Sequence, residues 1–127
     1  MKNYHSGFSI KGIGRSFKNS VRGFHVLLRN EYNLYIQIGL GIGITIVGFF
    51  FDLSHVEWAI QTSMIGFVIF SELVNTAIEK TMDLVNPEYD GRVRDIKDLS
   101  SGAVLFMVLV SVTTGLFIYL PKILPLL

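Results

Sequence analysis

Three long apolar stretches run along this chain of 127 residues. Leu34 to Phe51 and Leu99 to Leu120 carry no charged side chain, and Trp58 to Ser71 begins a third stretch whose helical pattern continues beyond it. A helix needs about 20 apolar residues to cross the hydrocarbon core of a bilayer. The pattern therefore predicts an all-α integral membrane protein with three transmembrane helices, at about residues 32–52, 56–85 and 98–120.

A different pattern precedes the first stretch. Apolar residues recur every three or four positions from Ile13 to Leu28, and basic residues occupy the opposite face. A helix of this kind typically lies in the membrane–water interface. We therefore expect an amphipathic surface helix over about residues 9–31, within a single domain of residues 1–127. The alternative, a soluble amphipathic helix packed on a core, is disfavoured because no soluble core remains for it to cover.

Small and aromatic residues add detail to the predicted spans. Gly39, Gly41 and Gly43 predict close helix packing in the first span, since small residues let helices approach each other. Trp58 and Tyr119 lie near span ends, where aromatic rings commonly sit at the level of the lipid headgroups. We therefore expect these two residues to act as interface anchors.

Composition and charge support a membrane location and give an orientation. Half of the residues are hydrophobic, and the mean hydropathy is +0.50. The absence of cysteine excludes disulfides and thiolate metal sites. Of the 11 lysines and arginines, all except Lys122 lie before the first apolar stretch or between Lys80 and Asp98. The positive-inside rule therefore predicts a multi-pass protein with a cytoplasmic N-terminus.

Polar side chains occupy one face of the second span. Glu72, Asn75, Glu79 and Asp83 recur every three or four residues, which places them on one side of a helix. An ionisable side chain costs about 3 kcal/mol at the bilayer centre, so such residues mark functional sites by default. Packing between helices is the alternative role, but two glutamates and an asparagine on one face favour function.

Two kinds of chemistry use such a stripe. In transporters, carboxylates relay protons or ions. In group transfer, one carboxylate acts as a base and another binds Mg²⁺ together with substrate phosphates. Glu31, just before the first span, offers a further carboxylate, and the segment from Glu88 to Asp98 mixes acidic and basic residues. This mixed charge suits a nucleotide better than an ion path. A membrane adaptor that uses the stripe only for helix packing is the third alternative.

Specific motifs resemble a known family. SELVNTAIEKTMDL (residues 71–84) resembles the signature E-[IL]-[LV]-N-[ST]-A-I-E-x-x-x-D of the prokaryotic membrane diacylglycerol kinase and undecaprenol kinase family. KDLSSGAVL (97–105) resembles its K-D-x-x-[SA]-[AG]-A-V-L element, and RGFHVLLRNE (22–31) its segment before the first span. The resemblance covers about residues 15–120. It implies a lipid kinase of the bacterial cytoplasmic membrane, a homotrimer with active sites between subunits.

The resemblance also implies roles for individual residues. Glu72 matches the catalytic carboxylate, which meets the lipid hydroxyl and accepts its proton, and Asn75 matches the signature asparagine of the active site. Glu31 and Glu79 match the carboxylates that hold the Mg²⁺ of MgATP. The other residues expected to bind ATP are Arg15, Glu88, Tyr89, Asp90, Lys97 and Asp98. Where the family often has a second acidic residue in the first span, this chain has Gln37.

The expected activity is transfer of the γ-phosphate of ATP to a lipid alcohol, with Mg²⁺. The segments DLSHVEW (52–58) and GLFIYLPKI (115–123) are more similar to undecaprenol kinases, so undecaprenol is the favoured acceptor. Diacylglycerol, which would give phosphatidic acid, is the alternative. A small proton or ion transporter would need the stripe but not Lys97 and Asp98. The expected partners are the lipid alcohol and further copies of the chain, and no nucleic acid.

Overall fold

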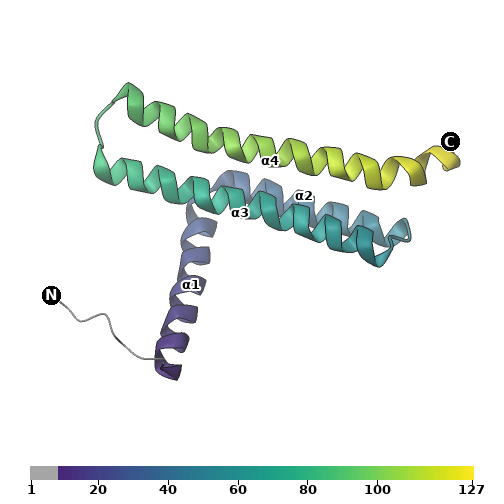
Figure 1. Ribbon diagram of the computed structural model, residues 1–127, viewed down its shortest axis with the longest axis horizontal. Helices are drawn as coiled ribbons and strands as arrows, with labels where there is room; N and C mark the ends of the chain where they lie inside the picture. The colour runs from purple at the N-terminus through teal and green to yellow at the C-terminus, as the bar shows by residue number, and fades with distance from the viewer. Residues whose placement is uncertain (1–8) are drawn as a thin grey trace. The chain divides into compact units, whose positions relative to one another are not determined.

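The computed structural model describes residues 9–127, and the regular structure within them is entirely helical. Figure 1 shows its elements, which are α1 (Ile10–Asn30), α2 (Tyr32–Phe50), α3 (His55–Val85), α4 (Gly91–Ile123) and the short 3-10 helix η1 (Leu124–Leu126). The all-α prediction is confirmed. The chain forms two compact units, of which the first ends at Glu31 and the second runs from Tyr32 to Leu127. The single kinase domain stays a prediction.

Helix α1 makes up the described part of the first unit and occupies nearly the whole range predicted for the surface helix. Most of its apolar side chains, among them Ile13, Phe17 and Phe24, are exposed, whereas Leu27 is buried. Lys11, Arg15 and the other basic side chains of the repeat are exposed as well. The helix therefore has the two-faced character expected from the sequence, and its position on a membrane surface stays a prediction.

Capping residues set where α3 and α4 begin. The Ser54 hydroxyl accepts a hydrogen bond from the Glu57 backbone at 3.2 Å, and the Glu57 carboxylate accepts one from the Ser54 backbone at 2.8 Å. This reciprocal pair satisfies two backbone N–H groups that a helix start leaves free. Asp90 caps α4 by accepting from the Arg92 backbone at 2.8 Å. Because Asp90 provides the cap, α4 begins about two turns before the predicted third span.

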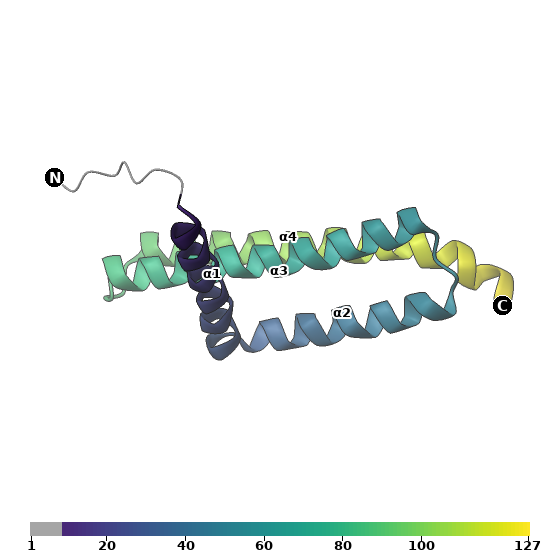
Figure 2. The same cartoon turned by 90° about the horizontal axis from the view of Figure 1, so that it is seen from below.

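The three helices of the second unit lie side by side, as Figures 1 and 2 show, and α3 packs against both α2 and α4. The Tyr119 hydroxyl of α4 lies 2.6 Å from Oε1 of Gln61 on α3 and 3.2 Å from the carbonyl oxygen of Ile44 on α2. Near this contact, Lys122 forms a 3.1 Å ion pair with Glu57. Tyr119 is only 7% exposed. The Tyr119 hydroxyl is therefore enclosed by acceptors on two neighbouring helices, and its role as an interface anchor stays a prediction.

Glycines allow close contact between α2 and its neighbours. A Cβ added at Gly48 would lie 2.8 Å from the Trp58 ring, and one at Gly41 would lie 3.1 Å from Ile65. A Cβ at Gly39 or Gly43 would meet nothing within 4 Å. Of the three glycines predicted to pack, only Gly41 does so within this unit.

Two helices of the described chain are long and apolar enough to cross a membrane. These are α2, with 19 residues, and α4 continued through η1, with 36 residues from Gly91 to Leu126. Helix α3 has 31 residues, but its second half carries Glu72, Glu79, Lys80 and Asp83. Large apolar side chains such as Phe50 and Phe117 are exposed on α2 and α4. Length and exposed apolar surface together favour a membrane location.

Candidate active site

The polar stripe of α3 passes from buried to exposed along the helix. Glu72 is 2% exposed and Asn75 is 7% exposed. Glu79, one turn later, is half-buried, and Asp83 is exposed. The stripe thus opens toward the connection between α3 and α4, which lies at the left end of the helix pair in Figure 1. One helix face therefore offers both a shielded carboxylate and a solvent-accessible one.

The buried carboxylate of Glu72 is held by α2. Nε2 of Gln37 donates a hydrogen bond to Oε2 of Glu72 at 3.1 Å. Oε1 of Gln37 is buried and has no hydrogen-bond partner among the described residues. A buried acceptor without a donor costs about 1–3 kcal/mol, so it favours a ligand that brings one. The family resemblance marks Gln37 only as a departure from an acidic residue, and nothing in the local sequence pattern indicates that α2 meets α3 at this residue.

Asn75 links Glu79 to α4. Its Nδ2 donates to Oε1 of Glu79 at 3.3 Å, and its Oδ1 accepts from the Ser100 hydroxyl at 2.6 Å. Ser100 is also buried. The neighbouring Thr76 has a buried hydroxyl oxygen without a partner among the described residues. The stripe is therefore a packed polar layer between α3 and α4, and Ser100 is a member that sequence reasoning missed.

Lys97 and Asp98 of α4, both predicted to bind ATP, make different contacts. Nζ of Lys97 lies 2.5 Å from Oδ1 of Asp83, so Lys97 joins the polar face of α3. Asp98 forms a 3.5 Å ion pair with Arg94 of its own helix, and both side chains are largely exposed. Helix α4 therefore brings Lys97, but not Asp98, to the stripe.

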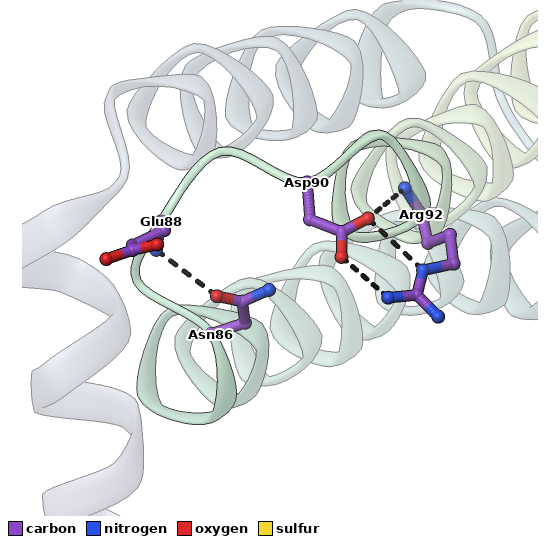
Figure 3. A network of polar contacts seen from close by, with 4 residues as sticks. All are labelled: Asn86, Glu88, Asp90 and Arg92. Atoms are coloured by element: carbon purple, nitrogen blue, oxygen red, sulfur yellow. Dashed lines mark hydrogen bonds and ion pairs between the residues drawn. The ribbon is translucent and has the colours of Figure 1, made fainter.

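The connection between α3 and α4 is ordered by its own polar contacts (Figure 3). The Asn86 side chain accepts from the Glu88 backbone at 3.3 Å, and the Asp90 carboxylate accepts from Nη2 of Arg92 at 2.9 Å. The Arg92 guanidinium lowers the pKa of the Asp90 carboxyl below its usual value, and hydrogen bonds from the Arg92 and Val93 backbone act in the same direction. Asp90 is therefore a carboxylate at neutral pH.

A cavity of about 410 Å³ lies beside this connection. Its lining includes five of the residues predicted to bind ATP, namely Glu88, Tyr89, Asp90, Lys97 and Asp98. Asp83 and Arg94 also line it, so the walls carry both signs of charge. The fold thus gathers residues that the sequence only placed near each other along the chain.

The two remaining predicted residues, Glu31 and Arg15, belong to the first unit. Arg15 is exposed and Glu31 is half-buried. Their contribution to a site on the second unit stays a prediction.

The donor atoms at the stripe fit a hard cation. Among residues 9–127, no group of three or more histidine, aspartate or glutamate side chains is arranged to hold a metal ion. Mg²⁺ does not require such a group, because it usually keeps waters and substrate phosphates and takes one or two protein carboxylates. Glu79 supplies such a carboxylate at the half-buried part of the stripe. The chemistry of these residues is therefore compatible with Mg²⁺.

Known proteins are similar in sequence to this chain over most of its length. The family described as prokaryotic diacylglycerol kinase matches residues 18–119. An undecaprenol kinase of Bacillus subtilis (strain 168) is 36% identical over 108 residues, which cover 85% of this chain and 88% of the relative. A diacylglycerol kinase of Escherichia coli (strain K12) is 30% identical over 117 residues, which cover 90% of this chain and 92% of that relative.

The family match covers α2, α3 and α4 as far as residue 119, and so contains the whole polar stripe and the cavity beside it. The chain therefore belongs to the prokaryotic diacylglycerol kinase family.

Proposed function

We propose that this protein transfers the γ-phosphate of ATP to the hydroxyl of a membrane lipid, and that the lipid is undecaprenol. Its family consists of lipid kinases, which matches the activity expected from the sequence. The name of the Bacillus subtilis relative supports undecaprenol, and the name of the Escherichia coli relative supports diacylglycerol as the alternative acceptor. The observation that carries the proposal is the stripe from buried Glu72 to half-buried Glu79.

Glu72 would accept the proton of the lipid hydroxyl. Its carboxylate is shielded from water and accepts a hydrogen bond from Nε2 of Gln37. An apolar groove of about 300 Å³ lies between α2 and α3 and includes Ile38 and Ile69. Ile38 follows Gln37 directly, and Ile69 lies about one helical turn before Glu72. The position of the groove therefore supports the proposal that a lipid chain binds at this end of the stripe.

The nucleotide would bind at the opposite end of the stripe. Phosphoryl transfer depends mainly on positioning and on neutralising phosphate charge. Lys97 would contribute its ammonium group to the phosphates, and Asn75 would hold Glu79 in place. Glu88, Tyr89, Asp90 and Asp98 would border the nucleotide from the cavity, with Arg15 added from the first unit. Glu31 and Glu79 would hold Mg²⁺, which when bound neutralises phosphate charge.

The arrangement in the membrane belongs to the same proposal. We take α3 as a membrane span in addition to α2 and α4, the N-terminus as cytoplasmic and the assembly as a homotrimer. The lysines and arginines near the α3–α4 connection support this orientation. Apolar side chains exposed on α2 and α4, such as Leu40, Leu109 and Phe117, support burial against lipid or other subunits.

To test this proposal, the purified protein in detergent is incubated with labelled ATP, Mg²⁺ and either undecaprenol or diacylglycerol. We expect label in the lipid fraction, with the higher kcat/KM for undecaprenol. Faster labelling of diacylglycerol would establish the alternative acceptor. If neither lipid is labelled while reconstituted vesicles conduct protons, the protein is a transporter and the kinase proposal is wrong.

A further inference from the structure

Ser100 of α4 lies among three residues of the proposed active site. Its hydroxyl oxygen is 2.6 Å from Oδ1 of Asn75 and 2.9 Å from the carbonyl oxygen of Lys97. Nδ2 of Asn75 in turn lies 3.3 Å from Oε1 of Glu79. A continuous line of polar contacts therefore runs from α4 through Asn75 to Glu79. Ser100 is 8% exposed, so water is largely excluded as a substitute partner.

The Ser100 hydroxyl has one hydrogen but two acceptors within reach. A serine hydroxyl donates once and accepts through its lone pairs. If its hydrogen points to the Lys97 carbonyl, only lone pairs of the hydroxyl face Asn75. The Asn75 amide would then have to turn its NH₂ group toward Ser100 and its oxygen toward Glu79.

That second arrangement is unfavourable beside the Glu79 carboxylate. It would place two acceptor oxygens, Oδ1 of Asn75 and Oε1 of Glu79, against each other with no hydrogen between them. In the arrangement that the structure shows, the Ser100 hydroxyl donates to Oδ1 of Asn75, and Nδ2 of Asn75 donates to the Glu79 carboxylate. Each acceptor then has a donor, and the bond to the charged group is the stronger kind. The direction of the Ser100 hydrogen and the orientation of the Asn75 amide are therefore coupled.

We propose that Ser100 is a positioning residue, whose hydroxyl holds the Asn75 amide so that its NH₂ group faces Glu79. The donated bond would fix the Glu79 side chain and occupy its Oε1, which leaves Oε2 to face a cation or water. The kinetic consequence rests on the proposed function, because it requires Glu79 to act at the nucleotide. Groups that orient a metal ligand in this way typically change metal affinity or activity about 10- to 100-fold when removed.

The first measurement observes the Asn75 side-chain amide by ¹⁵N NMR of the labelled protein in detergent micelles. Its signals are assigned by their absence in Asn75→Asp. In Ser100→Ala we expect these signals to shift and the amide hydrogens to exchange with solvent about 10-fold faster or more. The reason is that the Asn75 amide loses the hydrogen bond from Ser100 and becomes accessible to solvent more often. Ser101→Ala, which changes the exposed neighbour on α4, is the matched control and should leave the Asn75 signals in place.

The second measurement determines the Mg²⁺ concentration for half-maximal turnover and the KM for lipid. Ser100→Ala should raise the Mg²⁺ concentration for half-maximal turnover about 10- to 100-fold and leave the KM for lipid unchanged. Ser100→Thr, which keeps the hydroxyl, should recover most of the loss. Wild-type Asn75 signals together with a wild-type Mg²⁺ requirement in Ser100→Ala would overturn the proposal. So would an equal loss in Ser100→Thr together with a lower melting temperature, which would indicate packing alone.

The two measurements separate this inference from the proposed function. If the wild-type protein phosphorylates no lipid, the kinase proposal fails, and the Asn75 signals in Ser100→Ala still decide whether Ser100 orients the amide. If the wild-type protein is an active kinase and the Asn75 signals do not respond to Ser100→Ala, only the role of Ser100 is wrong.

Discussion

At the scale of single residues, two glutamates on one helix differ in what surrounds them. Glu72 is almost fully buried and contacts Gln37, whereas Glu79 is half-buried and contacts Asn75. Two side chains of the same type can therefore have different roles, Glu72 toward a lipid and Glu79 toward a water-soluble ligand. Substituting each by glutamine removes the charge with little change in shape.

Glu72→Gln should keep the fold and nucleotide binding but lower kcat by about 100-fold or more, because it removes the proposed general base. Steady-state kinetics measure the loss, and calorimetric titration with a non-hydrolysable ATP analogue measures binding. Asp52→Asn, in the exposed turn after α2, is the control and should behave as wild type. A Glu72→Gln protein with normal turnover would show that Glu72 is not the base.

Glu79→Gln should weaken nucleotide binding that depends on Mg²⁺, because a neutral amide is a poorer ligand for a hard cation than a carboxylate. We expect the affinity for the Mg²⁺ complex of the analogue to fall at least about 10-fold. The titration is repeated without Mg²⁺, where wild type and variant should bind alike. An unchanged titration with Mg²⁺ present would count against a metal role for Glu79.

At the scale of helices, the second unit is joined by different contacts at its two ends. Near the α2–α3 turn, Tyr119 contacts both α2 and α3, and Gly48 lets Trp58 approach α2. Near the α3–α4 connection, Asn75 meets Ser100 and Asp83 meets Lys97. The first set contributes packing and the second set contributes the proposed chemistry, so stability and activity are expected to respond to different substitutions.

Gly48→Ala should therefore lower the melting temperature without a specific effect on the site. The added methyl would lie 2.8 Å from the Trp58 ring and 3.0 Å from Leu53, so these side chains must move. Overpacking of this kind costs about 1–3 kcal/mol. Gly43→Ala on the same helix has nothing within 4 Å and is the matched control. Thermal unfolding in detergent compares the two, and equal melting temperatures would contradict the packing described for Gly48.

At the scale of the whole molecule, the residues predicted for one site belong to both units of the chain. Glu79 and Lys97 belong to the second unit, whereas Glu31 and Arg15 belong to the first. The family resemblance implies a homotrimer with active sites between subunits, and we propose that the residues of the two units in one site come from different subunits. Such an arrangement makes two inactive variants able to complement each other in one assembly.

Mixing Glu31→Gln with Glu79→Gln subunits should restore part of the activity, because some sites then receive both wild-type carboxylates. Each variant alone should be inactive or nearly so. The proteins are mixed in denaturing detergent, reconstituted together and assayed for lipid phosphorylation. Mixing Glu72→Gln with Glu79→Gln is the control and should restore nothing if both carboxylates of a site come from one α3. No recovery in the first mixture, or recovery in the control, would contradict the proposed division of the site.

The family and the positions of its main polar residues were accessible from the sequence because both depend on local patterns. The signature around Glu72 and Asn75 is contiguous, and helical periodicity alone places these residues on one face. The spans were predicted from apolar length, which does not indicate where the helix α4 begins. Its cap, Asp90, lies in a mixed-charge segment in which Asp98 and Ser100 are equally suitable caps by residue type.

The sequence by itself thus determined that the chain is helical, that it belongs in a membrane, and that one helix carries a polar face. Only the tertiary structure decided that Gln37 meets Glu72, that Ser100 meets Asn75, and that Lys97 rather than Asp98 joins the stripe. The physical reason is that periodicity fixes which side chains share a face of one helix. Contacts between helices depend instead on their relative register and rotation, which close packing of all the side chains sets together.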